Sequence, residues 1–272
     1  MSHDRRPDLA VSAAVGLALL VAFLRWPPPG TSAEDPRVGA LVGAFSLAGA
    51  IVLLVTAFWA FTIRQRLEED NPARLPWALL GCGLALLGTG EAIEAGDVLL
   101  TAEANAFPSW PDVLFLPAYP FFLLSFALFL RAYRVLSPRE PGEAATDGLT
   151  AALLVVGGTI AAFPVVRTET PWLERGVSLA YVGFDVLVVI VLLRLLRLTW
   201  RFRGGNLWKI WAGILSGFLF TSLADILFAY SQSRAIDESA AGALEVAVEV
   251  VFLISYLAIA RGTFEQRRIL AG

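Results

Sequence analysis

The chain has 272 residues, of which 57% are hydrophobic and 17% are charged, and its mean hydropathy is +0.68. Soluble domains contain about 45–50% apolar and about 25% charged residues, so this composition excludes an ordinary water-soluble domain. The net charge of −3 argues against nucleic-acid binding, and the single cysteine, Cys82, excludes a disulfide or thiolate-metal framework.

Taken in chain order, the apolar residues fall into eight blocks, separated by segments that hold nearly all the Arg and most of the Pro. Most blocks reach the roughly 20 residues that a helix needs to cross a bilayer. Within each block hydrophobicity extends around the whole helix, which gives no support to strands. The blocks span residues 9–26, 38–62, 77–100, 111–130, 148–166, 176–196, 207–230 and 243–260. We therefore predict an all-α polytopic membrane bundle of eight transmembrane helices, forming one integral membrane domain over residues 1–272.

The first block also fits a secretory signal peptide, because Arg5 and Arg6 precede a short apolar run. No small-x-small cleavage site follows it, where the sequence reads Phe-Leu-Arg-Trp-Pro over residues 23–27. We expect a retained first helix.

The basic residues predict the orientation, since Lys and Arg near helix ends are retained on the cytoplasmic side. With the N-terminus inside, most of the 21 basic residues lie in cytoplasmic segments, against Arg25, Arg37, Arg167, Arg175 and Arg234 outside. We expect both termini in the cytoplasm, a basic cytoplasmic tail over residues 262–272, and a multi-pass location in the cell membrane.

The third and seventh blocks resemble each other, as do the fourth and eighth. Trp77-Ala, Gly83 and Glu91 align at one offset with Trp211-Ala, Gly217 and Asp225. At a second spacing, the segment from Asp112 to Tyr119 matches the segment from Glu249 to Tyr256 in an acid, Val, Phe, Leu and Tyr. We predict a parallel 4+4 repeat, residues 1–135 and 147–262, related by an axis along the membrane normal. The alternative is chance similarity among Leu- and Val-rich helices.

Several acids lie inside the apolar blocks, although a carboxylate at mid-membrane costs about 2.5–3.5 kcal/mol on the insertion scale. No Arg, Lys or His lies at their depth within a block, so ion pairing is not expected. Protonation, hydrogen bonds to hydroxyls, a water-filled outer cavity or a bound cation remain as means of compensation. The alternative is that these acids only bridge helices or reach the outer interface. The acids are Glu91, Glu94, Asp97, Asp112, Asp185, Asp225, Glu245 and Glu249.

The repeat brings these acids and nearby hydroxyls into one predicted outward-facing acidic pocket. The candidate ligand-binding residues are Glu91, Asp112, Tyr119, Asp185, Asp225, Glu249 and Tyr256. Carboxylates alone would favour hard cations, but no ligand-loop spacing is present, so we predict no metal site and no cofactor.

Residues 107–120 read Phe-Pro-Ser-Trp-Pro-Asp-Val-Leu-Phe-Leu-Pro-Ala-Tyr-Pro. This resembles the Pro-Ser-x-x-Asp-x-x-x-Leu-x-x-Tyr-Pro signature of N-terminal multi-helix membrane modules in bacterial signalling proteins with GGDEF, EAL phosphodiesterase, PAS or histidine-kinase domains. The sixth block carries Tyr181-Val-Gly-Phe-Asp185, similar to a Tyr-Pro-x-x-Asp pattern of these modules but without its proline. The matching positions of the main motif are Pro108, Ser109, Asp112, Leu116, Tyr119 and Pro120.

The resemblance implies a sensory role, although no output domain follows within the 272 residues. Either this is the membrane part of a longer protein, or it acts through a separate partner. Ser109 is expected to cap exposed backbone amides at a helix entry, with Asp112 adding favourable charge there.

The leading hypothesis is therefore a membrane signal-input module, in which a ligand or proton in the acidic pocket shifts helix packing and the cytoplasmic helix ends carry the change inward. The alternatives are a proton- or cation-coupled secondary transporter and a structural membrane subunit. No catalytic residue is predicted, because the lone His3 precedes the first helix and removes His-dependent triads and zinc-protease motifs. Expected partners are the lipid bilayer and a cytoplasmic signalling domain or protein, with a homodimer as a further option and no nucleic acid.

Overall fold

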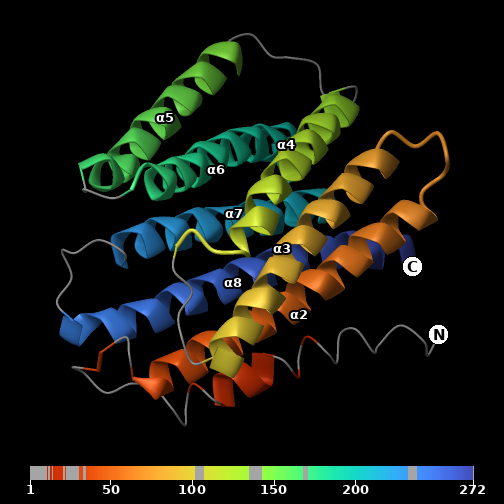
Figure 1. The fold of residues 1–272 in the computed structure, drawn as a ribbon. Helices are drawn as coiled ribbons and strands as arrows, with labels where there is room; N and C mark the ends of the chain where they lie inside the picture. Colours follow the sequence, from red (N-terminus) through yellow and green to blue (C-terminus); the bar gives the residue numbers. More distant parts are fainter. Residues whose placement is uncertain are drawn as a thin grey trace.

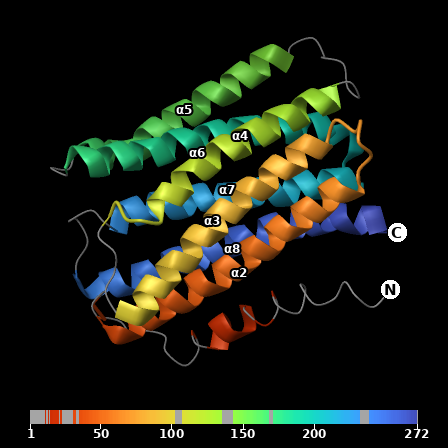
Figure 2. The ribbon, with the colours of Figure 1, turned by 45° about the vertical axis from the view of Figure 1, so that its right-hand side comes forward.

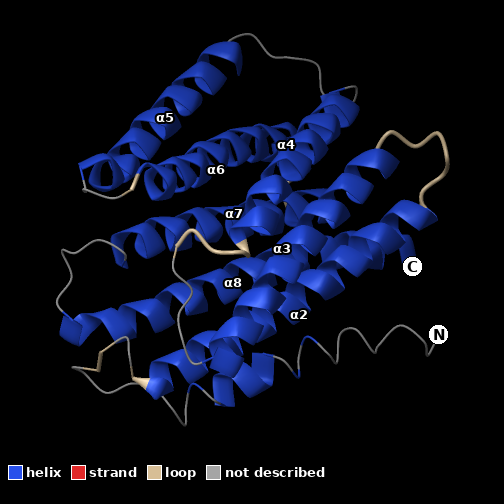
Figure 3. Cartoon of the chain, in the orientation of Figure 1, coloured by secondary structure: helices blue, strands red, loops and turns tan. Residues whose placement is uncertain are grey.

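The computed structural model describes residues 11, 13, 15–20, 22, 31–32, 35–101, 107–134, 143–167, 171–231 and 238–271. All regular structure in these ranges is helical (Figure 3), which confirms the predicted all-helical class for them. Much of the first predicted block, 9–26, lies outside the described residues, although residues 15–20 are helical. The elements are α2 (Pro36–Arg66), α3 (Arg74–Thr101), α4 (Asp112–Arg134), α5 (Glu143–Arg167), α6 (Trp172–Thr199), the short 3-10 helix η1 (Trp200–Phe202), α7 (Asn206–Ser231) and α8 (Glu238–Ala271).

Among the described residues, six helices are long and apolar enough to cross a membrane, namely α2, α3, α4, α6, α7 and α8. In α5 the described apolar stretch runs only from Ala145 to Thr159 and is shorter than those of the six. Eight crossings thus stay a prediction, whereas six candidate spans are present.

Helix boundaries follow local chemistry. At the start of α2, the Asp35 carboxylate accepts a hydrogen bond of 2.8 Å from the Arg37 backbone amide, and Pro36 occupies the first turn. Arg64 and Arg66 lie in the last turn, where positive charge is favourable at the negative end of the helix dipole. Between α6 and α7, Gly204 adopts a φ of 84°, which a residue with a Cβ rarely takes, and so lets the chain reverse direction.

The six candidate spans form a ring. Contacts join α2 to α3, α3 to α4, α4 to α6, α6 to α7, α7 to α8, and α8 back to α2. Helix α5 packs mainly on α6, at the outer edge of the bundle (Figures 1 and 2). The α2–α3 loop, the end of α4 and the end of α8 lie at one end of the bundle, and the α3–α4 loop lies toward the other (Figure 2).

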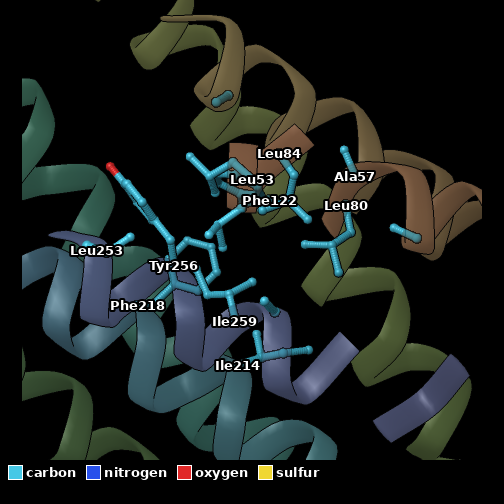
Figure 4. Packing of buried hydrophobic residues seen from close by; sticks show 14 of the residues in the cluster. Leu53, Ala57, Leu80, Leu84, Phe122, Ile214, Phe218, Leu253, Tyr256 and Ile259 are labelled. Atoms are coloured by element: carbon cyan, nitrogen blue, oxygen red, sulfur yellow. The ribbon is translucent and has the colours of Figure 1, made fainter. Parts of the chain in front are cut away.

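Aromatic side chains fill much of the ring interior. The rings of Trp77 on α3 and Trp211 on α7 both contact Phe129 on α4, with centroids 5.3 and 4.8 Å away. Closer to the middle of the bundle, the Phe122 ring lies edge-on to Phe218 at 5.0 Å (Figure 4). Edge-to-face pairs at these distances are favourable beyond their buried area, so this core fixes the rotation of α4 and α7.

Glycines let α7 and α8 approach closely. A Cβ added to Gly217 would lie 2.7 Å from the carbonyl oxygen of Ser255, and one added to Gly262 would lie 2.6 Å from that of Ile210. Small residues at such crossings are typical of helix pairs in membranes, where close packing replaces the hydrophobic effect as the driving force.

Residues 262–271, which were expected to leave the eighth helix as a tail, instead continue α8. The Glu265 side chain is buried and holds Arg261 Nη2 at 2.7 Å and Arg268 Nη2 at 2.8 Å. Arg267 lies over the ring of Trp59 on α2, with its guanidinium carbon 5.4 Å from the ring centroid. These contacts give the segment a packed face, which explains why it stays helical.

Candidate functional site

The entry of α4 positions the first acid. Oδ2 of Asp112 accepts hydrogen bonds from the backbone amide of Ser109 at 2.6 Å and from its hydroxyl at 3.2 Å. Oδ1 accepts a third hydrogen bond, of 2.5 Å, from the Tyr181 hydroxyl on α6. The side chain of Ser109 therefore binds Asp112 rather than the backbone amides that the sequence led us to expect. Asp112 joins the motif at the start of α4 to the sixth helix.

Tyr119 lies on α4 two turns after Asp112, between two further acids. Its hydroxyl oxygen is 3.0 Å from Asp185 Oδ1 on α6 and 3.3 Å from Asp225 Oδ2 on α7. A phenol carries one proton, so it can serve only one of these carboxyl groups at a time. Asp185 also interacts with Ser222 and with Asp225 itself, so Tyr119 is one of several groups that the two acids share.

A second tyrosine makes a comparable contact on the other side of the ring. Tyr256 on α8 donates a hydrogen bond of 2.6 Å to Glu91 Oε1 on α3, and both side chains are buried. Two turns earlier on α8, Glu249 accepts a hydrogen bond of 3.1 Å from the Ser46 hydroxyl on α2. These bonds tie α8 to its neighbour α2 and, across the ring, to α3.

The acids and tyrosines surround a cavity of about 100 Å³. Its lining combines carboxylates with aromatic rings from α3, α4, α6, α7 and α8 and from the segment just before α4. The carboxylates are Glu91, Glu94, Asp112, Asp225 and Glu249. The tyrosines are Tyr119, Tyr181 and Tyr256. The phenylalanines are Phe107, Phe115, Phe228 and Phe252.

The cavity has an unbalanced charge pattern. No Arg, Lys or His is among the described residues that line it. The carboxylate of Glu94 is partly buried, faces the cavity, and receives no hydrogen bond from the described part of the chain. A positive group entering this cavity would meet five acids and no competing base.

The cavity and the basic residues lie toward opposite ends of the bundle. Ser109 and Phe107 at the α3–α4 connection line the cavity, together with Ser178 near the start of α6. The other ends of the helices carry the clustered arginines, including Arg64 and Arg66 of α2 and Arg131 and Arg134 of α4. This polarity is the basis for assigning an inner and an outer side.

Six of the seven candidate residues taken from the sequence line the cavity, namely Glu91, Asp112, Tyr119, Asp225, Glu249 and Tyr256. Asp185 is not among the residues that line the cavity, but it contacts two that are, Tyr119 and Asp225. Glu94 was recognised as an intramembrane acid but was not included among the candidates. Its position three residues from Glu91 on one helix face was the available signal.

The aromatic lining and Ser46 were not anticipated. Their types are ordinary in apolar helices, so only the rotation of each helix in the bundle reveals them. Within the described ranges, no three His, Cys, Asp or Glu side chains are grouped so that they could hold a metal ion. Comparisons with models of known families, with curated proteins and with solved structures give no significant match.

Proposed function

We propose that the chain is an integral membrane signal-input module, in which a ligand or proton occupies the acidic cavity and changes the packing of the surrounding helices. One observation carries the proposal: five carboxylates from four helices, α3, α4, α7 and α8, line one cavity without a basic residue among the described lining residues. Acids within apolar helices are costly and tend to mark functional sites. A purely structural role would need only paired hydrogen bonds between helices.

The proposed topology has eight crossings with both termini in the cytoplasm of the cell membrane. It is supported by six described helices of sufficient length and hydrophobicity and by the arginines gathered at one end of the bundle. In this orientation the cavity opens toward the outside, where a sensor receives its stimulus.

A parallel duplication of the bundle, 1–135 and 147–262, is part of the proposal. Two hydrogen bonds support it: Tyr119 on α4 contacts Asp225 on α7, and Tyr256 on α8 contacts Glu91 on α3. In the predicted repeat the two tyrosines are equivalent, and so are the two acids. The proposed twofold axis therefore maps the Tyr119–Asp225 hydrogen bond onto the Tyr256–Glu91 hydrogen bond.

Packing contacts give independent support for the duplication. Gly83 on α3 abuts Phe122 on α4, and Gly217 on α7 abuts Ile259 on α8. The glycines are equivalent in the predicted repeat, and their partners each follow an equivalent tyrosine by three residues. The helix ring has the same symmetry, since the contacts α2–α3, α3–α4 and α4–α6 correspond to α6–α7, α7–α8 and α8–α2.

Helix α8 provides a route from the cavity to the opposite end of the bundle. Glu249 and Tyr256 contact the site region, and the same helix continues to the Glu265 ion pairs and the stacking of Arg267 on Trp59. A ligand that favours one packing of α8 against α2 and α3 would shift the position of this end. The ligand must bind the two packings with different affinity, because equal affinity shifts nothing.

The resemblance of residues 107–120 to bacterial sensor modules supports a cytoplasmic output domain or protein as the receiver. The test is a fusion of a cytoplasmic reporter enzyme to the C-terminus. Asp112→Asn and Asp225→Asn each remove a charge from the cavity, as a bound cation or proton would. We expect both to move reporter output by several-fold and in the same direction.

Glu69→Gln is the matched control, because that acid lies in the α2–α3 loop with a side chain that is 96% exposed. It should leave output at the wild-type level. Wild-type output from both cavity variants, with normal membrane levels, would contradict the signalling proposal.

A proton- or cation-coupled transporter is the second candidate. It is favoured by the proposed parallel repeat and by Pro117 and Pro120 inside α4, which remove two backbone donors beside the cavity. In this case, liposomes containing the protein would show substrate or proton flux that depends on a pH gradient. The sensor proposal expects no such flux.

A further inference from the structure

We infer that the ligand of the acidic cavity is a small organic ammonium ion, held by carboxylates at its charged end and by aromatic rings along its carbon skeleton. This inference rests on the proposed function of the same cavity and specifies the chemical class of its ligand.

The sign of the ligand follows from the lining. Five carboxyl groups face the space, whereas Arg, Lys and His are absent among the described residues that line it. An anion would be repelled, and a neutral molecule would leave the acids uncompensated. Cations are therefore the favoured class.

The internal hydrogen bonds leave acceptors available for a donor from the ligand. Tyr256 serves Oε1 of Glu91, Ser46 serves Oε2 of Glu249, and no hydrogen bond from the described residues reaches Glu94. An ammonium group carries up to three N–H donors, which matches several acceptors around one point. Charge-assisted hydrogen bonds of this kind are about twice as strong as neutral ones.

The rest of the lining separates an organic cation from a metal ion. A hard metal ion needs about six to eight oxygen ligands close together, or an octahedral set that includes water. The described acids are not grouped in that way. Instead, four phenylalanines and three tyrosines share the cavity with them. Aromatic faces attract ammonium groups by cation–π interaction and also bury carbon chains, but they offer little to a hydrated metal ion.

The size of the cavity limits the ligand. An apolar cavity of about 150 Å³ holds benzene, so a space of about 100 Å³ corresponds to a ligand of about five non-hydrogen atoms. A primary amine on a short carbon chain has this size, and it can contact both the carboxylates and the aromatic rings of the lining.

The inference is tested by binding to the purified 272-residue chain in detergent. The probes are butylamine, its uncharged analogue 1-butanol, its acidic analogue butyrate, and Ca²⁺. We expect butylamine alone to raise the Tm and to give a saturable heat of binding in calorimetry. Equal binding of 1-butanol would show a nonspecific hydrophobic pocket, and a response to Ca²⁺ alone would show a hard-cation site. Either result, or no binding of the amine at concentrations on the order of 10 mM, would overturn the inference.

Glu94→Gln is the informative variant, because it removes a charge without breaking a hydrogen bond within the described structure. Loss of one partner of a desolvated charge pair should weaken amine binding by about tenfold or more. Phe252→Leu tests the aromatic wall and should weaken the amine while preserving the charges. Glu69→Gln, far from the cavity, should bind like the wild type, and circular dichroism checks that each variant is folded.

The outcomes separate this inference from the proposed function. If Asp112→Asn and Asp225→Asn change reporter output but no amine binds, the signal-input role stands and the ligand class is wrong. If the amine binds and reporter output never responds to it or to the variants, the site is real and the signalling role fails.

Discussion

At the scale of single residues, the tyrosine–carboxylate bonds are the contacts most open to measurement. Tyr256→Phe removes the hydroxyl that donates to Glu91 over 2.6 Å. Hydrogen bonds between membrane helices contribute about 0.6 kcal/mol on average and up to about 1.7 kcal/mol. Because this bond is short and buried, we expect a loss at the upper end of that range in the unfolding free energy.

A double-mutant cycle with Glu91→Gln isolates the bond, with stability measured by unfolding in mixed micelles. The two single changes should be less than additive when combined. A coupling free energy near zero would mean that the two side chains do not interact.

Residue chemistry was partly readable from the sequence. The acids could be found because carboxyl groups are rare in apolar helices, and Tyr119 and Tyr256 could be found because they follow acids at the same spacing in two blocks. Ser46 and Phe252 could not, since a serine or phenylalanine in a membrane helix has no preferred partner until the helix rotation is known. Asp185 could be recognised from the sequence as an acid within an apolar helix. That it contacts Tyr119 and does not line the cavity depends on tertiary packing, which the sequence does not reveal.

At the scale of elements, the glycine contacts between α7 and α8 predict an asymmetric response to alanine. Gly217→Ala would place a methyl group 2.7 Å from the Ser255 carbonyl oxygen, so the helices must separate. Overpacking of this kind costs about 1–3 kcal/mol, and we expect a lower Tm in detergent.

Gly183→Ala is the matched control on α6, where an added Cβ meets nothing within 4 Å. It should leave the Tm unchanged or slightly raised, because alanine favours helix more than glycine does. Equal destabilisation by the two variants would contradict the close-packed α7–α8 interface.

Helix positions followed from hydropathy, whereas helix lengths did not. The block predicted at 38–62 lies within α2, Pro36–Arg66, because the polar end turns continue the helix without adding hydrophobicity. The largest difference is α8, which extends to Ala271 beyond the block that ended at 260. Its final turns are held by the Glu265 ion pairs, which lie within the helix, and by Arg267 on Trp59 of α2. The spacing of the ion pairs can be read from the sequence, but the contact with Trp59 cannot, because it depends on how α8 packs on α2.

At the scale of the whole molecule, the proposed orientation makes a direct prediction. Cys82 is the only cysteine, so Cys82→Ser gives a background without thiols. In that background, Trp110→Cys lies before α4 at a position that is 81% exposed, and Glu69→Cys lies in the α2–α3 loop. A membrane-impermeant maleimide added to intact cells should label the first and not the second.

Permeabilised cells provide the control, because both cysteines should then react. The reverse pattern in intact cells would invert the topology and turn the cavity toward the cytoplasm. Labelling of both would contradict a single orientation.

The ring of helices could not be derived from the repeat alone. A duplication predicts that contacts occur in equivalent pairs, but it does not say which helices close the ring. The contacts of α4 with α6 and of α8 with α2 do so, and they depend on side-chain packing such as Tyr119 on Phe184, with ring centroids 5.2 Å apart, and Trp59 on Phe264, at 5.5 Å.

The distance of the cavity from the arginine-rich end has an electrical consequence in the proposed orientation. A cation that enters from outside crosses part of the transmembrane voltage drop before it reaches the carboxylates. Moving one charge through the full drop changes its free energy by about 2.3 kcal/mol per 100 mV, so partial entry changes it by a fraction of that. An energised cell, negative inside, would hold such a cation more tightly than a depolarised one, and occupancy of the site would register the energetic state of the membrane together with the external ligand.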